Sequence, residues 1–176
     1  TPNLITADEP ISVAQYFTTQ GCSGNGSPYD PDMIILNPVE QNISNVTLVS
    51  SNLFATANRQ HHLHVIMRNG GTGISSFKLD GAAVATSSWT VHPNDPAYSY
   101  LYLANVTQGY HTLTSDSGFN ALAYGYADAE SYGYSAGANV KDLYQFVSIE
   151  NEYATVNFPA TCKNSPFYFQ NVFPYQ

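Results

Sequence analysis

His62 and His64 have the side chains and the spacing suited to metal chemistry. Successive side chains of a β-strand point to opposite faces, so these two imidazoles share one face and can reach a single zinc or iron ion. No carboxylate follows closely, so a metal-dependent enzyme would need a third ligand from another segment. The alternative is a polar outer face on a strand whose other face is core: Leu63, Val65 and Met67.

Asp30 and Asp32 are a second candidate pair, at the end of a glycine- and proline-rich loop over residues 20–31. Long loops in compact domains are often functional. Two carboxylates at this spacing can share a calcium ion, although the spacing of an EF-hand is absent. The alternative is a pair of aspartates that cap a turn.

Tyrosines supply the other candidate chemistry. Residues 98–103 alternate without a break, so Tyr98, Tyr100 and Tyr102 line one face while Leu101 and Leu103 mark the core face. An outward stripe of aromatic rings suits stacking on sugars or on a partner domain. The alternative is cross-strand aromatic pairing within the sheet, with each pair contributing about 0.2–1 kcal/mol.

Two further tyrosine pairs repeat an aromatic–glycine–aromatic pattern, at Tyr124 and Tyr126 and again at Tyr132 and Tyr134. They predict either a recognition surface or rings that cap one end of a β-sandwich, where each buried hydroxyl needs one partner. Trp89 is either a core residue or a platform on which a sugar stacks.

The elements that must position these residues are short strands separated by turn signals. We expect strands at residues 11–17, 33–36, 46–50, 61–67, 75–79, 82–85, 89–91, 98–103, 111–115 and 120–126, and we find no convincing helix. Asp80-Gly81 predicts a hairpin, and Asp116-Ser-Gly118 predicts a turn, followed later by a glycine- and tyrosine-rich loop around residues 132–134. The pattern predicts an all-β fold, an antiparallel β-sandwich resembling a jelly roll, with about ten or more short strands.

Composition limits the possible partners. Only 10% of the 176 residues are charged, 14% are aromatic, and the net charge is −8. Nucleic acids and anionic membranes are disfavoured because both are recognised through basic patches, whereas an acidic surface is compatible with calcium. No apolar run is long enough for a transmembrane helix. Such a composition is typical of extracellular β-proteins, which predicts a secreted or cell-surface location.

The two cysteines, Cys22 and Cys162, allow a disulfide. The bond would close a loop of about 140 residues and stabilise the fold by roughly 5 kcal/mol at most. Two free buried thiols are the alternative.

Several motifs, in order, resemble the N-terminal domain of the IgGFc-binding protein family: VAQYF at 13–17, DPDMIILNPVEQ at 30–41, FKLDG at 77–81, YSYLYL at 98–103, and HTLTSD with ESYGYSAG between 111 and 137. The resemblance covers about residues 5–143 and implies a secreted, modular, non-catalytic β domain. We therefore expect one domain at 1–143 and, at 144–176, a β tail or the first strands of an Ig-like or PKD-like module.

The leading hypothesis is a non-catalytic binding or adhesion module of a larger secreted or cell-surface protein. It would bind glycan or glycoprotein through its tyrosines and polar loops and would contact neighbouring domains of its own chain. A spacer domain that binds no ligand is one alternative, and a metal-dependent enzyme at His62 and His64 is another.

Overall fold

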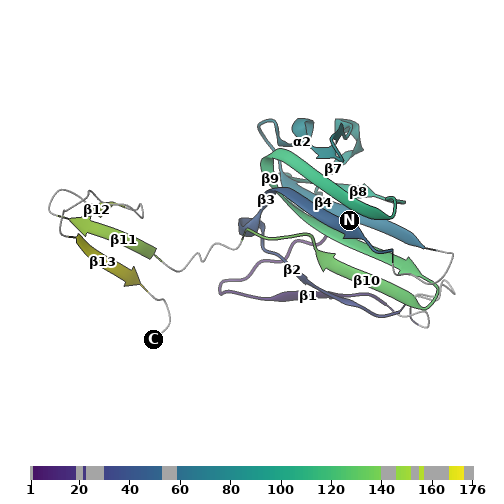
Figure 1. Ribbon diagram of the computed structural model, residues 1–176, viewed down its shortest axis with the longest axis horizontal. Coiled ribbons are helices and arrows are strands. Elements are labelled where there is room, and N and C mark those ends of the chain that lie inside the picture. Colours follow the sequence, from purple (N-terminus) through teal and green to yellow (C-terminus); the bar gives the residue numbers. More distant parts are fainter. Residues whose placement is uncertain are drawn as a thin grey trace. The chain divides into compact units, whose positions relative to one another are not determined.

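The computed structural model describes residues 2–18, 22, 30–52 and 59–139, and the backbone of three strands within 146–172. The chain divides into two compact units, Thr1–Asn139 and Val140–Gln176 (Figure 1). In the second unit, β11 (Phe146–Asn151) pairs in antiparallel fashion with β12 (Thr155–Val156) and with β13 (Phe167–Val172). The candidate site residues whose side chains are described all lie in the first unit.

In the described part of the first unit, the regular secondary structure is mainly β-strand, with three short helical turns. Its strands are β1 (Val13–Tyr16), β2 (Met33–Leu36), β3 (Ile43–Ser50), β4 (Gln60–Arg68), β5 (Lys78–Leu79), β6 (Ala82–Ala83), β7 (Trp89–Val91), β8 (Tyr98–Leu103), β9 (Gly109–Ala127) and β10 (Glu130–Ser135). The helical turns are η1 (Val39–Gln41), α2 (Gly73–Ser76) and η2 (Thr86–Ser88).

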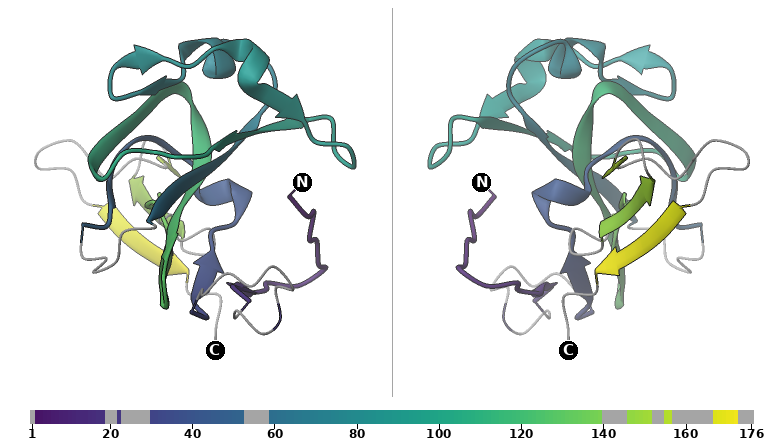
Figure 2. Two further views of the ribbon diagram at one scale, coloured as in Figure 1. Left: turned by 90° about the vertical axis from the view of Figure 1, so that its right-hand side faces the viewer. Right: turned by 90° about the vertical axis from the view of Figure 1, so that its left-hand side faces the viewer.

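Strand β9 is the centre of an eight-stranded antiparallel sheet. Its first half pairs with β3 on one edge and with β5 on the other, and its second half pairs with β10 and β4. Between these halves the pairing of β9 with β3 changes register. Ile43 and Asn45 of β3 are only two residues apart, but their partners on β9 are Phe119 and Thr114, so β9 holds the extra residues. Extra residues on one strand bend and twist it. Figure 2 shows β9 turning sharply, so that the sheet curls into two layers.

The main core lies between these layers. Strand alternation sends Leu63, Val65 and Met67 of β4 inward, and all three are fully buried, as predicted. Phe77 and Phe119 meet edge to face with ring centroids 5.4 Å apart. The remaining buried members of this cluster are Leu48, Leu101, Leu113, Ala121, Ala123 and Ala136.

A second apolar layer covers part of the sheet's outer face. Strands β1 and β2 form a separate antiparallel pair. Ile34 is buried, and the Ile34 and Phe17 side chains lie where a Cβ on Gly133 of β10 would be, at 2.6 and 2.7 Å. The Ser131 and Ser135 hydroxyls of β10 donate to the carbonyls of Asp30 and Ile35. These contacts hold the β1–β2 pair against β10.

The structure confirms the all-β prediction and the antiparallel pairing. The Asp80-Gly81 hairpin is also present: both residues have positive φ, 53° and 79°, as a type I′ turn requires, and they join β5 to β6.

Three local predictions were wrong. Asp116-Ser-Gly118 is not a hairpin turn but the bulged middle of β9, where a Cβ on Gly118 would lie 2.7 Å from the Asn42 Cβ. Residues 132–134 belong to strand β10, which pairs over its whole length with residues 122–127 of β9. Ser75 and Ser76 lie in α2 rather than in a strand, and their hydroxyls donate to the carbonyls of Thr72 and Gly73.

Replacing Gly125 with alanine should destabilise this fold. A Cβ there would lie 2.9 Å from the Gln60 carbonyl oxygen of the neighbouring strand and would also strike the Tyr132 ring. Overpacking of this kind costs about 1–3 kcal/mol, which chemical denaturation of the Gly125→Ala variant would measure. Ala82→Ser, at an exposed strand position, is the control. Equal stability of the two variants would contradict the close packing.

Candidate functional site

The outer face of β4, β8 and β9 brings together rings that are distant in the sequence. In the sheet register, His64 is opposite Tyr102 of β8, and His62 is opposite Tyr124 of β9. Residues directly opposite in an antiparallel pair point to the same face. We call the resulting group the tyrosine–histidine cluster, and its members are His62, His64, Tyr102, Tyr124 and Tyr126.

Hydrogen bonds and ring stacking fix the cluster. The Tyr102 hydroxyl lies 2.9 Å from Nδ1 of His62, and the Tyr124 hydroxyl lies 3.2 Å from Nε2 of His64. The His62 ring stacks on Tyr102 and Tyr124 at centroid distances of 5.7 and 5.1 Å. His64 meets the same two tyrosines edge to face, at 4.8 and 5.4 Å. Each histidine therefore orients two tyrosine rings.

Burial makes this cluster electrically neutral. It lowers the pKa of His62 and of His64 below the ordinary value of 6.5, and the neighbouring His61 and His62, respectively, add to the lowering. Burial also raises the pKa of the Tyr124 hydroxyl, helped by the nearby Tyr102 and Tyr126. At neutral pH the cluster consequently offers uncharged rings, hydroxyls and imidazole nitrogens.

One part of the cluster is covered and another is open. Phe17, next to β1, packs on Tyr124 and Tyr126 with ring centroids 5.6 and 5.4 Å away. Tyr102 keeps 47% of its surface exposed. Beyond it on β8, Tyr100 and Tyr98 are half-buried and lie opposite Ile66 and Arg68. The open surface is thus a row along β8 and β4 that starts at Tyr102.

Tyr132 and Tyr134 lie on the other face of the sheet. They are opposite Gly125 and Ala123, which face inward. The Tyr132 hydroxyl is 2.9 Å from Nδ1 of His61, and the Tyr134 hydroxyl donates to the Val49 carbonyl and accepts from the Val49 N–H. The two tyrosine pairs therefore do not form one surface, and this pair joins β10 to β3 and β4.

Trp89 packs against the main core, with its ring edge to face with Phe77 at 5.3 Å. Asp32 uses Oδ1 to accept the N–H of Met33 at 2.7 Å, and Asp30 is exposed. No group of three His, Cys, Asp or Glu side chains among the described residues is placed to hold a metal ion. Cys22 is exposed, whereas Cys162 lies outside the described residues, so their pairing stays a prediction.

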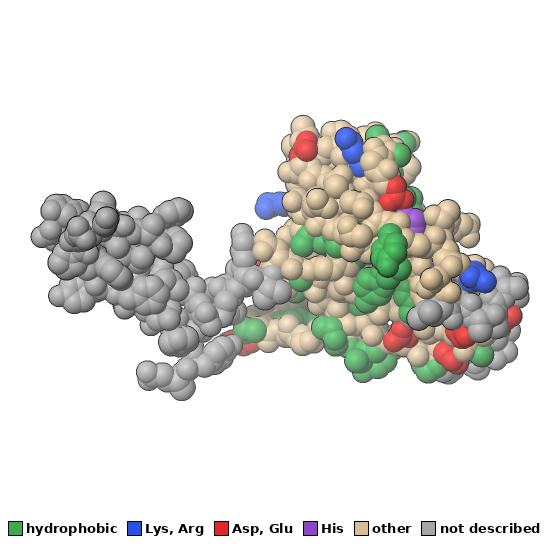
Figure 3. All heavy atoms as spheres, in the orientation of Figure 1, with side chains coloured by type: hydrophobic (Ala, Val, Ile, Leu, Met, Phe, Trp, Pro, Cys, Tyr) green, Lys and Arg blue, Asp and Glu red, His purple; other side chains and the backbone are tan. Residues whose placement is uncertain are grey.

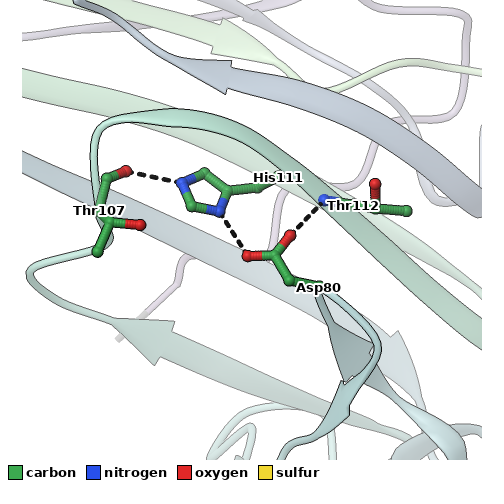
Figure 4. A network of polar contacts seen from close by, with 4 residues as sticks. All are labelled: Asp80, Thr107, His111 and Thr112. Atoms are coloured by element: carbon green, nitrogen blue, oxygen red, sulfur yellow. Dashed lines mark hydrogen bonds and ion pairs between the residues drawn. The ribbon is translucent and has the colours of Figure 1, made fainter.

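Asp80 and His111 form a second polar network, which joins the β5–β6 hairpin to β9 (Figure 4). The buried His111 ring has an acceptor at each nitrogen: Asp80 Oδ2 and the Thr107 carbonyl oxygen, both at 2.7 Å. Asp80 Oδ1 accepts the N–H of Thr112 at 2.8 Å. Burial raises the pKa of the Asp80 carboxyl. The hydrogen bonds from His111 and Thr112 lower this pKa by more, so the net shift is downward. This arrangement fixes the hairpin.

Sequence reasoning found the tyrosines and the two histidines but not their pairing, nor the role of Phe17. The only signal was the shared strand face of His62 and His64, since the partners are set by the register of β4 with β8 and β9.

Comparison with known proteins identifies the family of the chain. The family model described as IgGFc binding protein matches residues 1–125, more than half of the chain. The chain belongs to the IgGFc-binding protein family. Members of this family are binding domains rather than known enzymes. No curated protein and no solved structure matches the chain. Within the described residues, no helix has the length and apolarity to cross a membrane.

Acid should destabilise this domain through its outer histidines. The pKa values of His62 and His64 are lowered on folding, so the unfolded chain binds more protons at and below pH 6.5. The free energy of unfolding should therefore fall as the pH drops from about 7.5 to about 5. Urea denaturation across this range should show a shallower decline for the double variant His62→Gln, His64→Gln. An unchanged slope would place the acid sensitivity elsewhere.

Removing the Asp80 carboxylate should also weaken the domain. Asp80→Ala leaves two donors without their acceptor and places alanine at positive φ, a loss of about 1–3 kcal/mol. Asp80→Asn retains an oxygen and tolerates this φ, so it should lose less. Thermal and chemical denaturation of both variants test this, and an alanine variant as stable as the native protein would refute it.

Proposed function

We propose that this domain is a non-catalytic binding and adhesion module of a larger secreted or cell-surface protein. The tyrosine–histidine cluster and the tyrosine row on β8 are its recognition surface. The observation that carries the proposal is the half-exposed Tyr102 ring, held in place by His62 and His64.

Glycan, free or on a glycoprotein, is the ligand class that fits this surface best. Aromatic rings offer flat apolar area with few conformations to lose, and hydroxyls and neutral imidazoles exchange hydrogen bonds with sugar hydroxyls. The family name refers to binding of an immunoglobulin segment, which is itself a glycoprotein. The rings Tyr98, Tyr100, Tyr102, Tyr124 and Tyr126 share this face, whereas Tyr132, Tyr134 and Trp89 contribute to packing.

Neutral glycans should be preferred over acidic ones. The net charge of −8 repels anionic sugars at long range, and burial keeps the histidines uncharged at neutral pH. Arg68, at the far end of the row, supplies a local positive charge.

A glycan array is the direct test, with neutral members matched to their sialylated forms. We expect binding to neutral members, and Tyr102→Ala should weaken it about tenfold or more, as loss of a central aromatic anchor does. Tyr110→Ala is the matched control, because Tyr110 is exposed but lies on the first half of β9.

The same array separates the competing functions. Binding that is lost with EDTA and restored by calcium would bring Asp30 and Asp32 into the site. A blank array in both conditions, or equal losses for Tyr102→Ala and Tyr110→Ala, would overturn glycan recognition by this face and favour a spacer domain.

A further inference from the structure

The β1–β2 pair exposes an apolar face on the side turned away from the sheet. Tyr16 lies opposite Met33, and Ala14 lies opposite Ile35, so these four side chains share one face. All four are exposed, and Tyr16 retains 71% of its surface. We call this the hairpin outer face. Neighbouring exposed apolar residues in the chain are Ile11 and Val39.

Carboxylates lie near this face along the chain, and no lysine or arginine does. Residues 1–58 contain no lysine or arginine. In Figure 3, the apolar side chains over β1 and β2 have acidic side chains beside them. We call the carboxylates of this segment the acidic rim, and they are Asp8, Glu9, Asp30, Asp32 and Glu40.

The edge of the β1–β2 pair is also open. Within the described residues this sheet has two strands, and β1 pairs only with β2. The outer backbone groups of β1 are thus placed to pair with an added strand, a common way of binding extended peptides.

These three features select one kind of partner. The acidic rim disfavours an anionic lipid surface, and it disfavours a second copy of this chain because the same charges would meet. An extended protein segment that alternates basic and apolar residues fits the apolar face, the rim and the open edge together. We propose that the hairpin outer face and the β1 edge bind such a cationic, apolar segment of a partner protein.

The proposal is independent of glycan recognition, because the hairpin outer face points away from the sheet, whereas the proposed glycan surface centres on Tyr102 and the row along β8. Binding by the two surfaces can therefore be measured and lost separately.

The test uses the full chain and fluorescent peptides of alternating lysine and valine, with glutamate–valine and lysine–serine peptides as controls. We expect saturable binding of the lysine–valine peptide alone, weakened by rising salt. Tyr16→Ser should reduce its affinity about tenfold, whereas Tyr110→Ser, at a site that is 83% exposed, should leave it unchanged.

A charge series completes the experiment. Asp30→Asn with Glu40→Gln should weaken binding and flatten its salt dependence, while Asp95→Asn with Asp116→Asn changes the net charge equally and should do neither. Circular dichroism confirms that each variant is folded. Equal effects of the two charge pairs would show non-specific attraction, and absence of binding, or self-association through Tyr16 in sedimentation experiments, would overturn the proposal.

Discussion

The register shift in β9 is the constraint on which the rest of this domain depends. One strand of 19 residues serves both layers of the sheet, and the bulge between Thr114 and Phe119 turns it from one layer into the other. Each half of β9 pairs with a strand on both of its edges. A one-residue slip in the register of either half would therefore move buried side chains to the surface. The core and the outer aromatic face are thus set by the same backbone pairing.

The outer face shows how a β-sheet can hold polar groups rigidly. His62 is almost fully buried although it lies on the face away from the main core. Its Nδ1 forms a hydrogen bond with the Tyr102 hydroxyl, and its ring stacks on Tyr102 and Tyr124. A buried polar group that is satisfied in this way contributes order rather than strain. The exposed Tyr102 ring consequently presents a fixed surface to a ligand, with little conformational entropy left to lose.

Alternation along single strands could be predicted from the sequence, because it depends only on the period of two. This is why the inward faces of β4 and β8, with Leu63 and Leu101, were expected correctly. The bend at Ser117-Gly118 could not, since the local turn signal is overridden by strands that pair across it from distant parts of the chain. The His62–Tyr102 and His64–Tyr124 pairs depend on the register between three strands, which no single segment encodes.

The two bonds between Tyr134 and Val49 have a consequence for how this chain behaves in a crowded solution. They occupy a backbone N–H and C=O on the strand edge of β3 that is turned away from β9. A strand edge whose backbone groups are already hydrogen-bonded cannot pair with another chain at that point. Tyr134 therefore protects this position of β3 from edge-to-edge association. The phenol ring does this without adding a charge, which suits a protein whose surface carries few.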